Sequence, residues 1–274
     1  MAAKDHNILF KRIADALERL VPVASAPSKM DAPAYVWSGG AILPVADFQP
    51  ITLDLLTGID NQKAAVIENS QRLATAKAAH DILLWGARGT GKSALVKSSV
   101  AALQAIGLDL RLVEASGEDL ESLPALFSVL AHDSRPTIIF VDDLGFEANG
   151  PSARHLRSVL DGGAAARPKS VRLYVTSNRR HILPRNVDEQ SSAINPRDAA
   201  DDQLALADRF GLSLGFHVCD QDQYLSMVAG YAGHLKLPFD PSDALLWATQ
   251  RGARSGRVAW HYAVELAGRA GKSL

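Results

Sequence analysis

The stretch ILLWGARGTGKS, at residues 82–93, decides the fold of this 274-residue chain. From Gly86 onward it matches the phosphate-binding pattern G-x-x-x-x-G-K-[ST], in the context that the pattern requires: an apolar strand before it and a helical pattern after it. Its glycines permit a tight turn in which backbone N–H groups point at a bound phosphate. The stretch therefore predicts a nucleoside triphosphate site at the beginning of a helix.

The side chains of this loop have expected roles of their own. Lys92 brings a positive charge to the β- and γ-phosphates, and Ser93 offers its hydroxyl to Mg²⁺. The helix that begins here directs the positive end of its dipole toward the same anion. The predicted nucleotide-binding residues of the loop are Gly86, Ala87, Arg88, Gly89, Thr90, Gly91, Lys92, Ser93 and Ala94.

A pair of acidic residues follows a second apolar run. Residues 137–147 read TIIFVDDLGFE, so a strand delivers Asp142 and Asp143 at its carboxyl end. In nucleotide hydrolases the first acid of such a pair holds Mg²⁺, directly or through water, and the second polarises the attacking water. The second acid is usually Glu, so Asp143 departs from the common pattern and Glu147 is the alternative base. Asp142 is the predicted metal ligand.

Five short apolar runs alternate with helical patterns, which indicates an α/β fold around a parallel sheet. The runs are mostly continuous, as expected for strands covered on both faces. They lie at residues 82–85, 110–114, 137–142, 171–176 and 214–218, with predicted helices at residues 92–106, 120–131 and 151–160 between them. Ligands bind such sheets at the carboxyl ends of the strands, where the loop and the acidic pair would meet.

The chain is predicted to have three parts. Residues 1–47 hold an amphipathic helix at 7–21 and a linker rich in Pro, Ser, Ala and Gly, with a candidate short strand at 35–37. Residues 48–219 form the α/β nucleotide-binding domain. Residues 220–274 form a small helical domain, in which Asp240 followed by Pro241 caps the second of three helices.

The α/β domain is predicted to begin with a helix over residues 60–76, capped by Asp60 or Thr57. The apolar residues just before this helix precede the phosphate loop, so we expect them to wall an adenine pocket. They are Leu55, Leu56 and Ile59.

Composition narrows the possible partners and the compartment. Lys plus Arg is 29 against 30 for Asp plus Glu, so the net charge of −1 gives no global electrostatic case for nucleic acid or an anionic membrane. Nucleic acid stays an alternative through small arginine clusters at residues 154–157 and 179–185. The single Cys219 fits a reducing compartment. Charges interrupt the apolar residues of the first 26 positions, and no run is long enough to span a membrane, so we expect a cytoplasmic protein.

The wording LLWGARGTGKS with FVDDLGFE resembles the AAA+ ATPase superfamily, and within it the bacterial domain-of-unknown-function family 815, over residues 48–268. This resemblance implies a P-loop NTPase domain of the AAA+ type with a five-stranded parallel sheet, followed by a small C-terminal helical lid domain. It implies ATP and Mg²⁺ as ligands. It also implies assembly into a homo-oligomeric ring, with a hexamer as the expected size, in which one subunit completes its neighbour's site.

The resemblance assigns roles near the γ-phosphate. Asn178 ends the run YVTSN and matches the polar residue that senses the γ-phosphate from a strand between the two phosphate-contacting strands. Arg209, in LADRFGL, matches the arginine finger that reaches the γ-phosphate of the neighbouring subunit, with Arg179 or Arg180 as alternatives. Asp143, Glu147, Asn178 and Arg209 are therefore the predicted catalytic residues.

The resemblance also assigns nucleotide contacts to the helical domain. The run GARSGR resembles the second sensor motif, which presents an arginine to the phosphates; Arg257 is the preferred residue and Arg254 the second choice. Ile59 completes the predicted nucleotide-binding set on the base side.

Three functions fit these motifs. The leading hypothesis is an ATPase that uses hydrolysis to remodel or load an unknown macromolecular partner, such as a protein. Residues 115–122 lack the aromatic residue typical of threading unfoldases, which weakens that particular role. The alternatives are a nucleotide-gated adaptor with little hydrolysis, suggested by Asp143 in place of Glu, and a small-molecule phosphotransferase built on the same loop.

Overall fold

The computed structural model describes residues 30–145, 151–162, 167–178 and 206–273. The chain divides into two compact units, Met1–Ala32 and Pro33–Leu274, and every element described below belongs to the second. The predicted helix at residues 7–21, the alternative base Glu147 and the arginine cluster at residues 179–185 lie outside the described residues.

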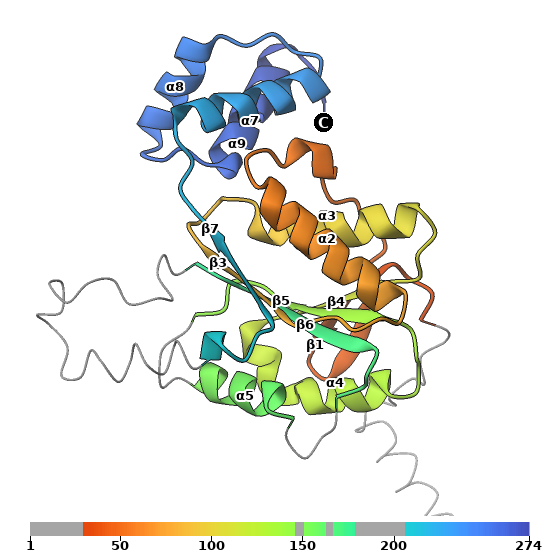
Figure 1. The fold of residues 1–274 in the computed structure, drawn as a ribbon. Helices are drawn as coiled ribbons and strands as arrows, with labels where there is room; N and C mark the ends of the chain where they lie inside the picture. The colour runs from red at the N-terminus through yellow and green to blue at the C-terminus, as the bar shows by residue number, and fades with distance from the viewer. Residues whose placement is uncertain (1–29, 146–150, 163–166, 179–205, 274) are drawn as a thin grey trace, which may run out of the picture. The chain divides into compact units, whose positions relative to one another are not determined.

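A seven-stranded sheet lies at the heart of this second unit (Figure 1). In space its strands follow the order β2-β1-β4-β5-β6-β3-β7, and every neighbouring pair is parallel except β1 with β2. The strands are β1 (Ala34–Ser38), β2 (Ala41–Pro44), β3 (Ile82–Gly86), β4 (Arg111–Ala115), β5 (Thr137–Val141), β6 (Val171–Ser177) and β7 (Leu212–Phe216). The five strands predicted from apolar runs are all present, and they are the five that form β3 to β7.

The expected count of five strands in the sheet is wrong, because two more come from the segment that the sequence assigns to a linker. One of them, β1, confirms the candidate strand at residues 35–37, and β2 was not predicted. β1 adds to the edge of the parallel sheet beside β4, and a turn through Gly39 and Gly40, both at positive φ, returns the chain as β2. Trp37 of β1 is 1% exposed, and its indole N–H donates to the Ser122 hydroxyl at 2.7 Å. Pairing with a distant strand and this burial stabilise β1, and neither is visible in a short run between Pro and Gly residues.

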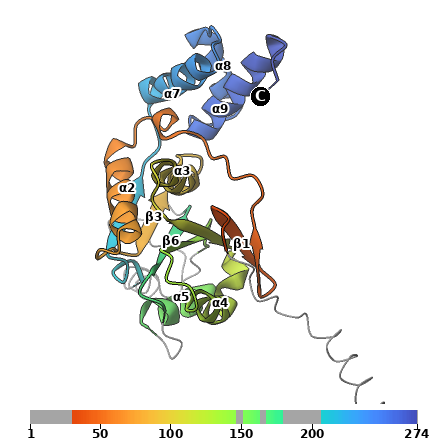
Figure 2. The same ribbon diagram turned by 90° about the vertical axis from the view of Figure 1, so that its right-hand side faces the viewer.

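Helices cover both faces of the sheet (Figures 1 and 2). α2 (Asp60–Ala74) and α3 (Lys92–Ala105) lie on one face, and α4 (Leu123–Leu130) and α5 (Pro151–Leu160) lie on the other. All five residues of β5 are buried, as its continuous apolar run predicts. α4 begins three residues later than expected, because the 3₁₀ helix η2 (Gly117–Ser122) precedes it and holds a capping box between Ser116 and Asp119.

The predicted cap of α2 is also wrong. Ile59 occupies the N-cap position, and neither Thr57 nor Asp60 makes a side-chain cap bond there. The helix is instead fixed to the sheet by a buried polar contact: the Tyr174 hydroxyl of β6 lies 2.9 Å from both the Asn69 amide nitrogen and the Ser70 hydroxyl. Burial raises the pKa of Tyr174 to about 12, so its hydroxyl stays protonated across the physiological pH range.

Three helices follow the sheet and share a second apolar cluster: α7 (Gln221–His234), α8 (Pro241–Gln250) and α9 (Gly256–Arg269). Tyr224 and Tyr262 are fully buried in this cluster. The Asp240 carboxylate accepts from the Ser242 N–H and so caps α8, as the sequence predicts, while the Ser255 hydroxyl caps α9. Within the described ranges, no helix is long and apolar enough to cross a membrane.

Replacing Trp37 tests whether β1 is part of the folded unit. Trp37→Ala removes a buried ring and its hydrogen bond, so the free energy of unfolding should fall by about 3–5 kcal/mol in urea denaturation. The control is Leu43→Ala on β2, where the side chain is 52% exposed and the change should stay within about 0.5 kcal/mol. Equal stability of the two variants would show that β1 contributes nothing to the fold.

Candidate nucleotide-binding site

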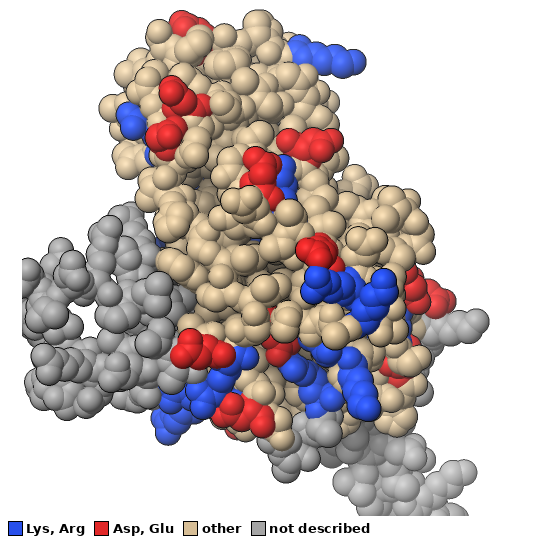
Figure 3. All heavy atoms as spheres, in the orientation of Figure 1, with Lys and Arg blue, Asp and Glu red and all other residues tan. Residues whose placement is uncertain are grey.

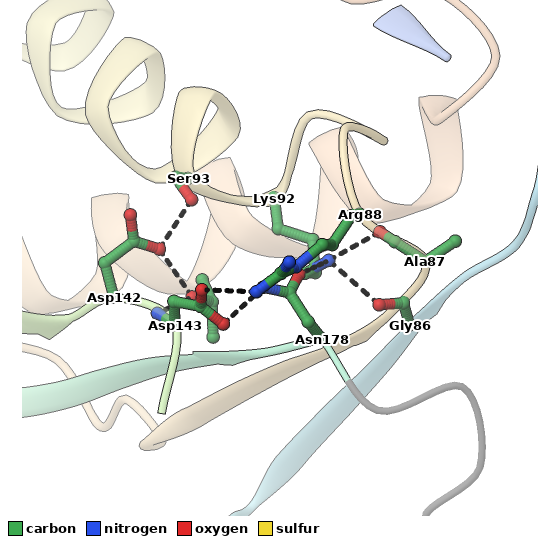
Figure 4. A network of polar contacts seen from close by, with 9 residues as sticks. Gly86, Ala87, Arg88, Lys92, Ser93, Asp142, Asp143 and Asn178 are labelled. Carbon is green, nitrogen blue, oxygen red and sulfur yellow. Dashed lines mark hydrogen bonds and ion pairs between the residues drawn. The ribbon is translucent and has the colours of Figure 1, made fainter. Parts of the chain in front are cut away.

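The strand order brings the sequence motifs to one edge of the sheet. β6 lies between β3 and β5, so the residues that follow these three strands are neighbours although they are far apart in sequence. The phosphate loop follows β3, Asp142 and Asp143 follow β5, and Asn178 follows β6. Figure 4 shows their side chains meeting beneath the start of α3.

The loop packs closely against the end of β7. Gly86 has φ +130°, and a Cβ atom on it would lie 2.0 Å from the Phe216 carbonyl oxygen. The same carbonyl accepts from the Ala87 N–H at 3.0 Å, which fixes the first turn of the loop. Gly91, at φ +94°, occupies the N-cap position of α3. Glycine is therefore required at Gly86 by both backbone angle and space.

Lys92 is buried beneath the loop. Its ammonium group donates to the Gly86 and Ala87 carbonyls at 3.0 and 2.7 Å and to the Asn178 side-chain oxygen at 3.0 Å. Burial lowers the pKa of Lys92 to about 8, although Asp143 and Asp142 act in the opposite direction. A bound phosphate would give this ammonium a better partner than the carbonyls of its own loop.

Asp142 accepts two hydroxyl hydrogen bonds on one oxygen. Ser93 Oγ and Thr176 Oγ1 each lie 2.6 Å from Asp142 Oδ1. A hydroxyl and a carboxylate side by side are hard oxygen ligands, and Mg²⁺ in nucleotide sites is held by one or two such groups together with phosphate oxygens. Ser93 and Asp142 therefore fit the predicted metal role. Thr176 was not predicted, although the polar run at the end of YVTSN contains it.

Asp143 adopts an uncommon backbone conformation, with φ +51°. The Thr176 hydroxyl accepts from the Asp143 N–H at 2.8 Å, and the Thr176 carbonyl accepts from the Leu144 N–H at 2.8 Å, so β6 holds this turn in place. The Asp143 carboxylate accepts from the Asn178 amide on Oδ1 and pairs with Arg88 Nη2 at 3.4 Å through Oδ2 (Figure 4).

A cavity of about 280 Å³ joins this polar cluster to an apolar end. Leu55, Leu56 and Ile59 line the apolar end, as the sequence predicts, and Ile51 lies beside them. The bundle adds three residues that were not predicted as part of the site: Met227 and Tyr231 of α7 and Trp260 of α9. Only the folded arrangement shows that these helical residues face the cavity.

The structure separates the predicted arginines. Arg257 lines the cavity, and its backbone N–H donates to the Gly89 carbonyl at 3.3 Å. Arg254 is exposed and is not among the described residues that line the cavity. Arg209 also lies outside that lining, where its guanidinium pairs with Asp161 at 2.6 Å. Of the predicted residues whose side chains have chemical roles, the cavity gathers Ile59, Lys92, Ser93, Asp142, Asp143, Asn178 and Arg257.

The parallel sheet and the phosphate loop give the chain the fold of a P-loop NTPase domain. The chain belongs to the family described as "Protein of unknown function (DUF815)", which it matches over residues 30–270. The expected resemblance to this family is thereby confirmed, and the solved structures below share the expected AAA+ fold. No curated protein matches the chain.

Similar solved structures share the fold at low sequence identity. The RuvB Holliday junction branch migration motor of Thermotoga maritima has a TM-score of 0.50 and 15% identity, covering 82% of this chain and 68% of that one. Domain III of the replication initiation protein DnaA from the same organism has a TM-score of 0.52 and 12% identity, over 82% and 94%. The ORC2 protein of Aeropyrum pernix has a TM-score of 0.51 and 14% identity, over 83% and 67%.

The lowered pKa of Lys92 predicts a pH dependence of nucleotide affinity. A bound phosphate favours the charged ammonium and so raises this pKa. The affinity is therefore highest at pH values below the free-protein pKa of about 8 and falls at higher pH. Between pH 7 and 9 the affinity for ADP should fall by about tenfold, the change in the protonated fraction of Lys92. Titration calorimetry at constant Mg²⁺ measures this fall.

The matched control is Lys92→Arg, which stays charged throughout this range. Its affinity, weaker or not, should vary little between pH 7 and 9. A tenfold fall in this variant would assign the pH dependence to another group.

Proposed function

We propose that this protein hydrolyses ATP and uses the resulting conformational change to remodel or load a macromolecular partner. The observation that carries the proposal is the meeting of Lys92, Asp142, Asp143 and Asn178 on one cavity whose other end is apolar. Such a cavity offers cations and N–H groups to phosphates, and aliphatic and aromatic walls to a base.

Each residue then has a chemical role. The loop N–H groups and Lys92 hold the phosphates, and Ser93 and Asp142 hold Mg²⁺, which would neutralise charge on the phosphate oxygens. Asp143 accepts the proton of the attacking water, and Asn178 positions that water and the γ-phosphate. Arg257 contacts the phosphates from α9, and Ile59 contacts the base.

The three-helix bundle is proposed to act as a lid. Its connection to the loop is direct: a Cβ atom on Gly89 would lie 2.9 Å from the Ser255 hydroxyl, and the Gly89 carbonyl accepts from the Arg257 N–H. A nucleotide that changes the loop therefore changes the contact at the start of α9. The bundle would transmit that change to a neighbouring subunit or partner.

Self-association completes the site in this proposal. We place Arg209 at the γ-phosphate of a neighbouring subunit in a ring, with a hexamer as the proposed size. In the single chain the Arg209 and Asp161 side chains are 34% and 52% exposed, so the guanidinium is at the surface and can exchange its partner. The pair with Asp161 keeps the finger in place until a neighbour arrives.

The partner is proposed to be a protein met in the cytoplasm. Over the face shown in Figure 3, acidic and basic side chains are interspersed among the described residues, which suits a protein surface better than a polyanion. The two similar structures from Thermotoga are a Holliday junction branch migration motor and a domain of a replication initiation protein, so nucleic acid is the alternative partner.

A nucleotide-gated adaptor is the second candidate. The Asp143 carboxylate is shorter than the usual Glu and is already bonded to Asn178 and Arg88, an arrangement that favours binding over turnover. Steady-state phosphate release by the concentrated protein separates the two candidates. Release no faster than that of an Asp142→Ala variant would support the adaptor.

Removing Arg209 tests catalysis across subunits. Turnover per subunit should rise with protein concentration, and Arg209→Ala should keep nucleotide affinity while hydrolysis falls by about 10³-fold or more. Arg269→Ala, which removes another surface arginine in ion pairs, should leave both unchanged. Turnover that depends neither on concentration nor on Arg209 would reject the shared site.

Mixing two inactive variants makes the same test positive. Lys92→Ala subunits lack the ammonium group that holds the phosphates but still carry Arg209. Arg209→Ala subunits keep an intact phosphate loop. A mixture should recover part of the wild-type phosphate release, since some neighbours then form complete sites. A mixture as inactive as its components would show that Arg209 acts within its own chain.

A further inference from the structure

The side chain of Arg88 has no role in the phosphate-loop pattern, which uses only the backbone at this position. It is 73% exposed, and its Nη2 lies 3.4 Å from Oδ2 of Asp143. Arg88 is not among the described residues that line the cavity, but its ion-pair partner Asp143 is. Figure 4 shows its guanidinium reaching across from the loop toward Asp143 and Asn178.

Asp143 and Lys92 are joined by an amide. Asn178 Oδ1 accepts from the Lys92 ammonium, and Asn178 Nδ2 donates to Asp143 Oδ1. With Arg88 on Oδ2, both Asp143 oxygens have protein partners within the described residues. A carboxylate paired with a cation is a weaker base than a free one, so loss of the exposed partner, Arg88, would make Asp143 a better acceptor of a proton from water.

We propose that Arg88 is a γ-phosphate contact made within its own chain, which leaves Asp143 when ATP binds and so frees an oxygen of Asp143 for the attacking water. This rests on the proposed hydrolysis of ATP. ADP lacks the γ-phosphate, so with ADP the pair between Arg88 and Asp143 stays closed. Arg88 thereby distinguishes ATP from ADP.

Three physical points support the exchange. Exposed ion pairs such as this one are weak, so a competing anion breaks them at little cost. A phosphate accepts the planar guanidinium in a bidentate manner and carries more charge than one carboxylate. Arg88 is also part of the loop that holds the phosphates, so a side-chain rotation suffices and the loop backbone keeps its contacts.

Binding measurements test this without any need for turnover. In the full chain with Mg²⁺, Arg88→Ala should leave ADP affinity unchanged and weaken a non-hydrolysable ATP analogue by about tenfold, as expected for one lost hydrogen bond to a charged group. Arg88→Lys should lie between Arg88→Ala and the wild type. The control Arg72→Ala removes an exposed arginine paired with Glu68 on α2 and should change neither affinity.

Removing the competing carboxylate provides the second test. Asp143→Asn should tighten the ATP analogue relative to ADP by about threefold or more, the size of a weak ion pair. The gain should be absent when Arg88→Ala is added, because the released guanidinium is then missing. A gain of equal size in the double variant would assign it to general repulsion from Asp143 and overturn the exchange.

Other outcomes are equally decisive. Equal weakening of ADP and the ATP analogue by Arg88→Ala, or no effect on either, would reject a γ-phosphate contact. If the wild-type protein binds the analogue but releases no phosphate from ATP, the proposed hydrolase is rejected. The selectivity of Arg88 for the analogue over ADP is still tested by the affinities above.

Discussion

The parallel pairing of β6 between β3 and β5 is the constraint on which the site depends. It aligns Trp85 with Ser177 and Val141 with Val175, so the three strands end side by side. Lys92 can then bond Asn178, and Asn178 can bond Asp143, through single hydrogen bonds although the three residues come from separate parts of the chain. Thr176 serves both acids at once, accepting from the Asp143 backbone and donating to the Asp142 carboxylate. A shift of β6 by one residue would turn Thr176 to the opposite face and break both contacts.

Much of this could be predicted from sequence because the signals are local. A glycine-rich loop between an apolar run and a helical pattern predicts a phosphate-binding site, and the acids after β5 are predicted to belong to the same site. The apolar runs also gave five strands correctly, since strands covered on both faces leave little room for polar residues. The start of α2 at Asp60 was predicted correctly, but its cap was not, because Ile59 occupies the N-cap position without a side-chain bond; at α8 the cap itself, Asp240, was predictable.

What sequence did not predict depends on distant contacts. The candidate strand at residues 35–37 is confirmed as part of β1, but its pairing with β4 and the hydrogen bond from Trp37 to Ser122 join residues far apart in sequence. Tyr231 of α7 and Trp260 of α9 come from separate helices, and their rings pack edge to face at 5.3 Å between centroids. That they also line the cavity follows only from the direct contact of the start of α9 with the loop at Gly89. Core and site are therefore the same residues at this point of the bundle.

The aspartate at position 143 connects these observations to control of hydrolysis. Asp143 has a positive φ. Its carboxylate accepts a hydrogen bond from Asn178, which follows β6, and pairs with Arg88 of the phosphate loop. A glutamate, with one more methylene group, would place its carboxylate farther from the backbone of this turn. In our proposals hydrolysis depends on two conditions: a γ-phosphate that draws Arg88 away, and a neighbour that supplies Arg209. Such a site hydrolyses ATP only when it is both filled and assembled, which suits a protein whose nucleotide state reports on its assembly.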